Sequence, residues 1–268
     1  MIIDFHAHIF PDKIAEGAVS TLAKRGNIPA YSDGKETTLI AEMERAGITL
    51  SVNLPVLTRP EQFLGTMRYV AEINKKYDTG RGILSFAGIH PNIPDLEGAI
   101  FTIRDAGFRG IKIHPDYQGV FIDDERYVRM LSLAKAAGLI TVTHAGVDAA
   151  YVNEGIKCAP TRILRLLDKI GGYEKLVLAH LGGNQIYRDV YDSLAGEDLY
   201  FDTGYILGDV KKERFTEVLS KHGEDKILFG SDSPWRDVAE DVKIVRDFGL
   251  GEAEEKIFYL NAKRLLGI

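Results

Sequence analysis

Residues 123–144, DDERYVRMLSLAKAAGLITVTH, hold the pattern that decides the fold. Apolar residues recur at a spacing near 3.6 over residues 123–137, which predicts a helix with one apolar face. That face consists of Tyr127, Met130, Leu131 and Ala134. Gly138 is a typical helix end, and the short β-branched run 140–143 that follows has the character of a buried strand. A helix that leads directly into such a strand is the repeating unit of an α/β fold.

The same unit recurs along the whole chain. Eight short apolar runs are predicted to be strands, at residues 2–5, 50–56, 83–89, 110–113, 140–143, 176–179, 199–202 and 227–229. Helices are predicted after them, at about 37–46, 61–76, 96–106, 123–137, 161–170, 185–194, 212–222, 238–248 and 252–266. Most of the strands are nearly continuous in apolar residues, as parallel strands covered on both faces are. We therefore predict one domain over residues 1–268, a (β/α)8 TIM barrel of the α/β class, with a doubly wound open sheet as the alternative.

Composition limits the classes of partner. The chain has 268 residues and a formal net charge of -6, which argues against nucleic acid as a main partner. No run approaches the ~20 apolar residues of a membrane span, and the N-terminus has no secretory signal pattern. A single cysteine, Cys158, excludes an intramolecular disulfide and is expected to be a small buried side chain. We expect a cytoplasmic protein with a small-molecule substrate, and a homo-oligomer is compatible with the sequence.

Two connections are unusually long. Residues 9–36 follow the first strand and include an extra predicted helix around 14–24, and residues 145–160 follow the fifth strand. Both are on the C-terminal side of strands, where barrel enzymes build their active sites. We predict that both segments cover the substrate.

Histidines mark the same side of the barrel. His6 and His8 are two residues apart in the first strand, so their side chains leave the same face and can converge on one ion. Six of the seven histidines, all except His222, are at predicted strand ends: His6, His8, His90, His114, His144 and His180. His222 is near a helix end, where an ordinary surface role or a role at the helix C-terminus suffices. The concentration of the other six predicts one shared site.

Several motifs together resemble the amidohydrolase superfamily, in particular its amidohydrolase-related branch of metal-dependent hydrolases and decarboxylases. They are residues 4–8 (DFHAH), 110–115 (GIKIHP), 144–146 (HAG), 179–183 (AHLGG), 229–235 (FGSDSPW) and 261–266 (NAKRLL). The resemblance implies a divalent metal bound by His6, His8 and His144, with Asp232 as a further ligand or as the general base. It also implies that His180 binds a second metal or contacts the reacting water and substrate.

The implied ligand set is chemically consistent. Imidazole and carboxylate suit zinc, and an incomplete protein shell leaves a position for water, whose pKa the ion can lower to about 7. Asp232 could then act as proton shuttle. Lys112 is either a carbamate that bridges two metals, as in some binuclear members, or an ordinary ammonium. We expect one zinc ion per chain rather than two.

Residues on the rim loops are candidates for substrate contact. His114 shares a strand face with Lys112, although a structural role would be equally ordinary for it. Tyr117 and Trp235 can pack against a planar substrate and hydrogen-bond through their polar tips. Further candidates on these loops are Gln118, Asp148, Tyr151 and Tyr205, and Arg59 could hold a carboxylate.

These features favour a metal-dependent hydrolase of a small amide, lactone, lactam or ester, with metal-activated water and Asp232 as proton shuttle. The alternative on the same site is a nonoxidative decarboxylase of a small carboxylic acid. A TatD-type nuclease is a weaker alternative, because Lys112 stands where that group has an acidic residue. A binding barrel without catalysis is the weakest.

Overall fold

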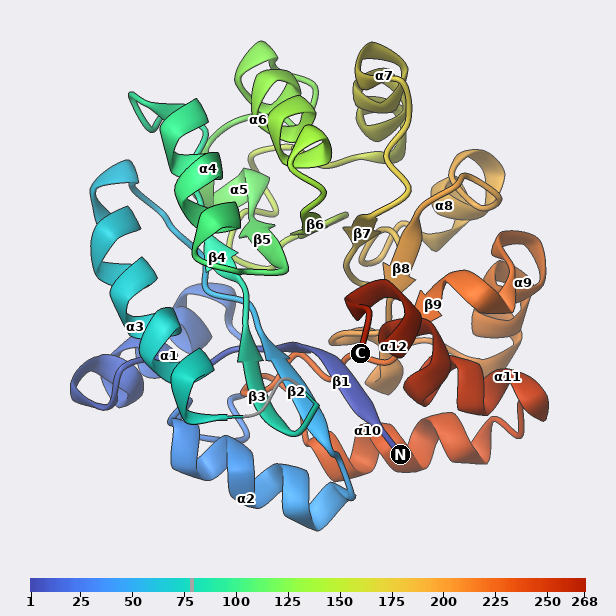
Figure 1. The fold of residues 1–268 in the computed structure, drawn as a ribbon. Coiled ribbons are helices and arrows are strands. Elements are labelled where there is room, and N and C mark those ends of the chain that lie inside the picture. The colour runs from blue at the N-terminus through green and yellow to red at the C-terminus, as the bar shows by residue number, and fades with distance from the viewer. Residues whose placement is uncertain (78–79) are drawn as a thin grey trace.

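The computed structural model describes residues 1–77 and 80–268, and it places the strands in the interior with helices around them (Figure 1). The strands are β1 (Ile3–Ala7), β2 (Leu50–Asn53), β3 (Gly82–Ser85), β4 (Ala87–Gly88), β5 (Gly110–Ile113), β6 (Ile140–Thr143), β7 (Leu176–Leu178), β8 (Tyr200–Asp202) and β9 (Ile227–Leu228). All pairings between these strands are parallel, in the orders β1-β2-β3 and β4-β5-β6-β7-β8-β9.

Individual main-chain hydrogen bonds join the two sheets into a barrel. Between β3 and β4, the N–H of Phe86 donates to the carbonyl of Asn53 over 3.0 Å. On the other side of the ring, the N–H of Phe5 in β1 donates to the carbonyl of Phe229, next to β9, over 2.8 Å. The fold is therefore the predicted TIM barrel and not an open sheet.

Helices surround this ring. They are α1 (Asp12–Gly26), α2 (Glu36–Ala46), α3 (Phe63–Lys76), α4 (Leu96–Asp105), α5 (Pro115–Gln118), α6 (Glu125–Ala136), α7 (Pro160–Ile170), α8 (Tyr187–Ser193), α9 (Lys212–His222), α10 (Val238–Asp247), α11 (Glu252–Glu255) and α12 (Asn261–Leu266). Short 3-10 turns lie at η1 (Pro60–Gln62), η2 (Ile206–Gly208) and η3 (Glu224–Lys226), and a π-helical turn, η4 (Lys256–Leu260), joins α11 to α12.

The observed elements follow the predicted ones closely. Each of the eight predicted strands is present, and the third is divided into β3 and β4 at Phe86. The extra helix in the first long connection is α1. The four-residue α5 after β5 was not predicted, because Pro115 at its first position is its main local signal. The last predicted helix is divided into α11, η4 and α12.

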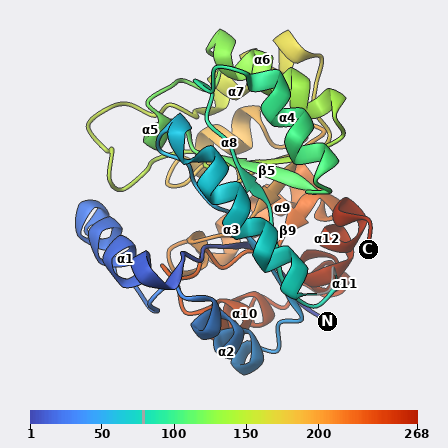
Figure 2. The same cartoon turned by 60° about the vertical axis from the view of Figure 1, so that its left-hand side comes forward.

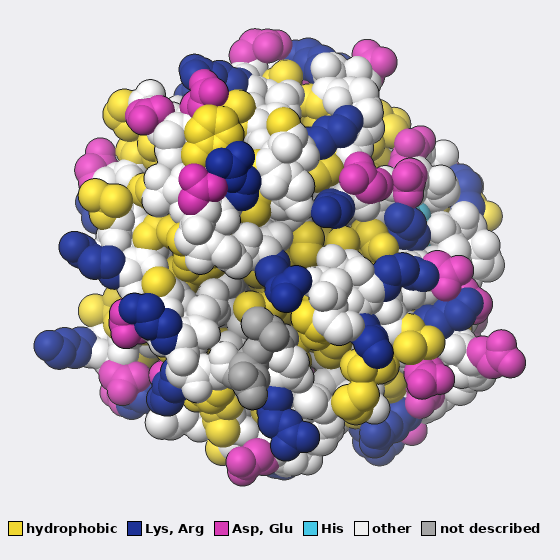
Figure 3. Space-filling view, in the orientation of Figure 1, with side chains coloured by type: hydrophobic (Ala, Val, Ile, Leu, Met, Phe, Trp, Pro, Cys, Tyr) yellow, Lys and Arg dark blue, Asp and Glu magenta, His cyan; other side chains and the backbone are white. Residues whose placement is uncertain are grey.

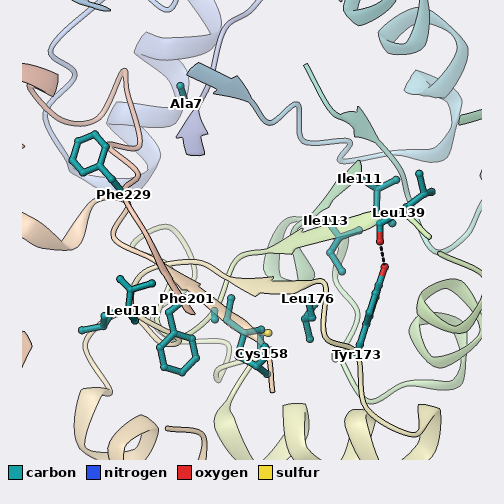
Figure 4. Close-up of a cluster of buried hydrophobic side chains, with 14 of the residues drawn as sticks. Ala7, Ile111, Ile113, Leu139, Cys158, Tyr173, Leu176, Leu181, Phe201 and Phe229 are labelled. Carbon is teal, nitrogen blue, oxygen red and sulfur yellow. Dashed lines mark hydrogen bonds between the residues drawn. The ribbon is translucent and has the colours of Figure 1, made fainter. Parts of the chain in front are cut away.

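Two apolar clusters stabilise the barrel. Phe5, Val142 and Val177 belong to strands on different sides of the ring and pack in one buried cluster, which therefore fills the barrel interior. The larger cluster packs the helices onto the outer faces of the strands. Figure 4 shows part of it, including Tyr173, whose hydroxyl also donates to the carbonyl of Leu139 over 2.6 Å. Cys158 is fully buried there, as predicted, and burial raises the pKa of its thiol.

The two long connections meet at one end of the barrel. Figure 2 shows α1 on the left, at the opposite side of the molecule from the two termini. The Arg25 guanidinium at the end of α1 lies 4.3 Å from the ring centroid of Tyr151 in the segment 145–160. It also lies 5.7 Å from the ring of Tyr117, next to β5. The two segments thus contact each other over the C-terminal ends of the strands.

The surface carries charges of both signs. Figure 3 shows Lys and Arg side chains interspersed with Asp and Glu on the face that it presents.

Among the described residues, none of the helices combines the length and the apolar character that crossing a membrane would require.

His222 differs from the surface role expected for it. Its side chain is buried and stacks on Phe201 with ring centroids 3.8 Å apart. Its Nδ1 accepts from the N–H of Gly196 over 3.2 Å, and its Nε2 lies 3.1 Å from the carbonyl of Leu199. The sequence reading was wrong here, because the helix position did not reveal that this face of α9 packs on β8.

We expect His222 to make the protein less stable in acid. Burial lowers its pKa from 6.5 to about 4. The unfolded chain therefore binds the proton first, and the contribution of His222 is complete above pH 6.5 and is lost as the pH falls towards 4. A shift of this size corresponds to ~3 kcal/mol. Urea unfolding between pH 7 and 4 should show a smaller loss of stability in His222→Gln than in the wild type, whereas parallel profiles would contradict the assignment.

Candidate metal centre

The candidate site lies at the C-terminal mouth of the barrel. His6 and His8 are at the end of β1, and His180 and Asp232 follow β7 and β9. His180, Leu181 and Asp232 have φ of 62°, 55° and 67°, although none of them is glycine. Such left-handed backbone costs of order 1–3 kcal/mol for a residue and tends to occur at functional sites.

Three side chains form a group with the spacing of metal ligands. His6 Nε2 lies 3.2 Å from His8 Nε2, and Asp232 Oδ1 lies 3.0 Å from His8 Nε2 and 3.4 Å from His6 Nε2. These atoms all lie within 4.8 Å of one another. The two imidazole planes make an angle of 71°, so both nitrogen lone pairs can point at one ion. Two imidazoles and a carboxylate form a donor set that suits a divalent transition metal.

In three imidazoles of the site, the ring nitrogen that points away from the site, Nδ1, is within hydrogen-bond distance of an oxygen acceptor. His6 Nδ1 lies 2.9 Å from Asp202 Oδ2, and His8 Nδ1 lies 2.7 Å from the carbonyl of Leu54. His180 Nδ1 lies 2.8 Å from the carbonyl of Gly204. Each acceptor requires the proton on Nδ1 of a neutral ring, which leaves the Nε2 lone pair facing inward. The residues present therefore fit a metal ion.

Asp202 is a site residue that the sequence reading missed. It is completely buried, and its Oδ1 accepts from the main-chain N–H of His180 over 3.1 Å and of Gly204 over 2.9 Å. Burial alone would raise the pKa of Asp202, but the interactions with His6, His180 and Lys112 together outweigh this and hold the pKa below its usual value. Its place at the C-terminal end of β8 was the available signal, since the other site residues occupy the same position on their strands.

His144 and Lys112 lie beside the three-residue group. His144 Nδ1 faces His180 Nε2 at 3.0 Å, and the His180 ring stacks on His6 with centroids 5.4 Å apart. Lys112 Nζ donates to His6 Nε2 over 3.1 Å. All the residues that the resemblance implied for one or two metals therefore adjoin one another, but His144 is not among the three whose ligand atoms form the compact group.

Burial lowers the pKa of three basic groups of the site. It lowers the pKa of His6 to about 4, that of His144 well below 6.5, and that of Lys112 to about 8. The two imidazoles are therefore neutral near pH 7. This is the protonation state in which imidazole binds a metal.

A second cluster of His114, His144 and Asp148 has ligand-like spacing but unsuitable ring geometry. The His114 and His144 rings are stacked, with centroids 4.3 Å apart and planes only 11° apart. An ion bonded to a ring nitrogen lies close to the ring plane, and one ion cannot lie in two parallel planes that are separated in this way. His114 Nε2 instead lies 3.3 Å from Asp148 Oδ2.

The rim residues have different environments. Tyr117 packs edge-on against His114 with centroids 4.4 Å apart, and Trp235 is half-buried after β9. Gln118, a predicted substrate contact, is instead structural, because its amide donates to the carbonyls of Leu57 and Ile89 over 2.9 and 2.6 Å. These bonds tie the ends of neighbouring strands together.

Arg25, and not the predicted Arg59, packs over the tyrosines of the rim. Arg59 is exposed at the start of η1, where its N–H donates to Gln62. Arg25 lies over the rings of Tyr151 and Tyr117 instead. The sequence could not indicate this position, because residue 25 approaches these tyrosines only through the path of the long first connection.

Comparison with known proteins agrees with the fold. A 5-carboxyvanillate decarboxylase from Sphingomonas paucimobilis is 16% identical, covers 100% of this chain and 99% of its own, and has a TM-score of 0.70. A dihydroxybenzoic acid decarboxylase from a Polaromonas species, solved with manganese and the inhibitor 2-nitroresorcinol, is 16% identical, covers 99% and 96%, and has a TM-score of 0.73. An uncharacterized TIM-barrel protein from Bordetella bronchiseptica is 18% identical, covers 99% and 98%, and has a TM-score of 0.76.

Sequence comparison identifies the family. Among curated proteins none matches this chain. The profile of the family described as Amidohydrolase matches residues 3–268, which include both strand-one histidines and Asp232. This match covers almost the entire barrel, and the chain belongs to the amidohydrolase family.

Proposed function

We propose that this protein is a metal-dependent nonoxidative decarboxylase of a small carboxylic acid. The observation that carries the metal chemistry is the convergence of His6, His8 and Asp232 within 4.8 Å at the barrel mouth. Similarity to two decarboxylases over nearly the full length of the chain favours carbon dioxide release over hydrolysis. The support therefore favours the alternative that the sequence offered rather than its first reading as a hydrolase.

His6, His8 and Asp232 would hold the ion, with His144 as a fourth ligand through Nδ1. The bound metal would supply a positive charge that stabilises negative charge developing on the substrate. Zinc suits the donor set, while one of the similar structures contains manganese. One ion per chain fits the two ligand-like groups, because only that of His6, His8 and Asp232 has ring planes that can share an ion.

The remaining residues would bind the substrate and move a proton. Decarboxylation breaks the bond between carbon and the carboxyl group, and the electron pair left on carbon takes up one proton. His180 is the candidate to deliver it, since its Nε2 faces His144 within the site. Because Nδ1 keeps its proton towards Gly204, His180 would first take up a second proton from solvent on Nε2 and then pass that proton to the carbon. His114, Tyr117 and Trp235 would contact the substrate, and Arg25 would attract an anionic group to the mouth.

The decisive experiment measures products with metal-loaded protein. We expect protein purified with Zn²⁺ or Mn²⁺ to hold about one ion per chain and to release carbon dioxide from a member of a panel of hydroxylated benzoic and enoic acids. Treatment with a chelator should stop the release, and added metal should restore it. A parallel panel of amides, lactones and esters provides the comparison. Turnover of amides, lactones or esters alone would mean that the protein is a hydrolase and not a decarboxylase. Protein that holds no metal after metal-replete purification would overturn both metal-dependent reactions.

A further inference from the structure

Within the described residues, the His144 ring lacks the oxygen acceptor that the outward nitrogens of His6, His8 and His180 have. His144 Nε2 and Asp116 Oδ2 are both buried side-chain atoms without a hydrogen-bond partner in the described parts of the chain. They lie 3.9 Å from each other. Buried polar atoms are nearly always paired in proteins, so two adjacent unpaired ones that could serve each other require an explanation.

The expected role of His144 supplies one. A ring that binds metal through Nδ1 carries its proton on Nε2, and a buried N–H needs an acceptor. Asp116 is at the right place, and a movement of about 1 Å would bring its oxygen within hydrogen-bond distance. The outer nitrogens of His6, His8 and His180 already have oxygen acceptors.

We infer that Asp116 is a positioning residue, which accepts a hydrogen bond from His144 Nε2 and thereby aims Nδ1 at the metal. This inference rests on the proposed metal centre. The short helix α5, directly after β5, brings Asp116 Oδ2 to within 3.9 Å of His144 Nε2.

The neighbouring groups leave this role to Asp116. The carboxylate of Asp148 already lies 3.3 Å from His114 Nε2. His114 cannot share an ion with His144, because their rings are nearly parallel and stacked. A second metal between these two rings therefore does not explain the unpaired atoms, whereas a hydrogen bond from His144 to Asp116 does.

The test measures affinity for Zn²⁺ alone, by competition with a chromophoric chelator. Partners that orient metal-bound imidazoles typically contribute 10–100-fold to metal affinity, so Asp116→Ala should raise the Kd for Zn²⁺ by about that factor. Asp116→Asn has nearly the same shape and keeps one acceptor oxygen. It should bind Zn²⁺ more weakly than the wild type and more tightly than the alanine variant, and it provides the answer if Asp116→Ala does not fold.

Asp241→Ala is the matched control. Asp241 is also a buried aspartate with one unpaired oxygen, but its other oxygen pairs with Arg236 and not with an imidazole of the site. The Asp241→Ala substitution should lower the melting temperature of the protein and leave the Kd for Zn²⁺ unchanged. Wild-type affinity in both Asp116 variants, or an equal loss in Asp241→Ala, would overturn the role of Asp116. Wild-type protein that binds no Zn²⁺ would overturn the proposed metal centre itself.

Discussion

Replacing His8 by alanine is expected to remove the bound metal and to lower turnover on the order of 1,000-fold or more. His8 Nε2 lies 3.0 Å from Asp232 Oδ1 and 3.2 Å from His6 Nε2, so the substitution removes one of the three ligand atoms of the compact group. A catalytic metal supplies several kcal/mol of stabilisation, and ~4 kcal/mol corresponds to a factor of 1,000 in rate. Elemental analysis and carbon dioxide release measure the two effects.

His90→Asn is the matched control for this experiment. His90 also follows a barrel strand and is buried, but its Nδ1 accepts from the N–H of Asn92 and it belongs to neither ligand-like cluster of the described residues. Asparagine preserves an acceptor there, and metal content and turnover should remain close to wild type. Full metal content in His8→Ala would show that the ion binds elsewhere.

Asp202→Asn is expected to weaken metal binding by about 10–100-fold although it hardly changes the volume of the side chain. Oδ1 of Asp202 accepts two main-chain N–H groups, so the single amide oxygen of asparagine should occupy that side. The amide NH₂ then faces His6 Nδ1, which must become an acceptor. The His6 proton moves to Nε2 and blocks the lone pair that would bind the metal.

The tautomer argument predicts a specific pattern of measurements. Zn²⁺ affinity and turnover should fall together in Asp202→Asn, while circular dichroism of the metal-free protein remains that of the wild type. Asp241→Asn, an equally buried exchange in a carboxylate that pairs with Arg236 and with no imidazole of the site, should change neither affinity nor turnover. If Asp202→Asn bound Zn²⁺ as tightly as the wild type, the hydrogen bond to His6 would not control its tautomer.

The barrel was predictable because its signals are local. An amphipathic helix pattern followed by a glycine and a short apolar run predicts the helix and strand at residues 123–143 without knowledge of the rest of the chain. His6 and His8 were also predictable, since a period of two residues places them on one face. Asp232 was predictable from its position directly after the last strand, because the C-terminal ends of barrel strands come together at one face.

The roles of residues that lie outside a strand end or a motif could not be predicted in this way. Gln118 has a loop-like sequence context, but its amide donates to the carbonyls of Leu57 and Ile89, in the segments after β2 and β4, and these bonds give it a structural role. His222 follows an ordinary helix pattern, but the packing of α9 buries it against Phe201. In both residues the deciding contact is with a segment remote in sequence.

The sequence by itself determined the barrel, the family and the residues that converge at the mouth, because strand periodicity and motif order are encoded along the chain. Only the tertiary structure decided how each imidazole is oriented. Asp202 is 196 residues from His6, and the acceptor of His8 is a main-chain carbonyl 46 residues away. Such hydrogen bonds depend on distances of a few tenths of an ångström between remote segments, and they select the ring nitrogen that carries the proton.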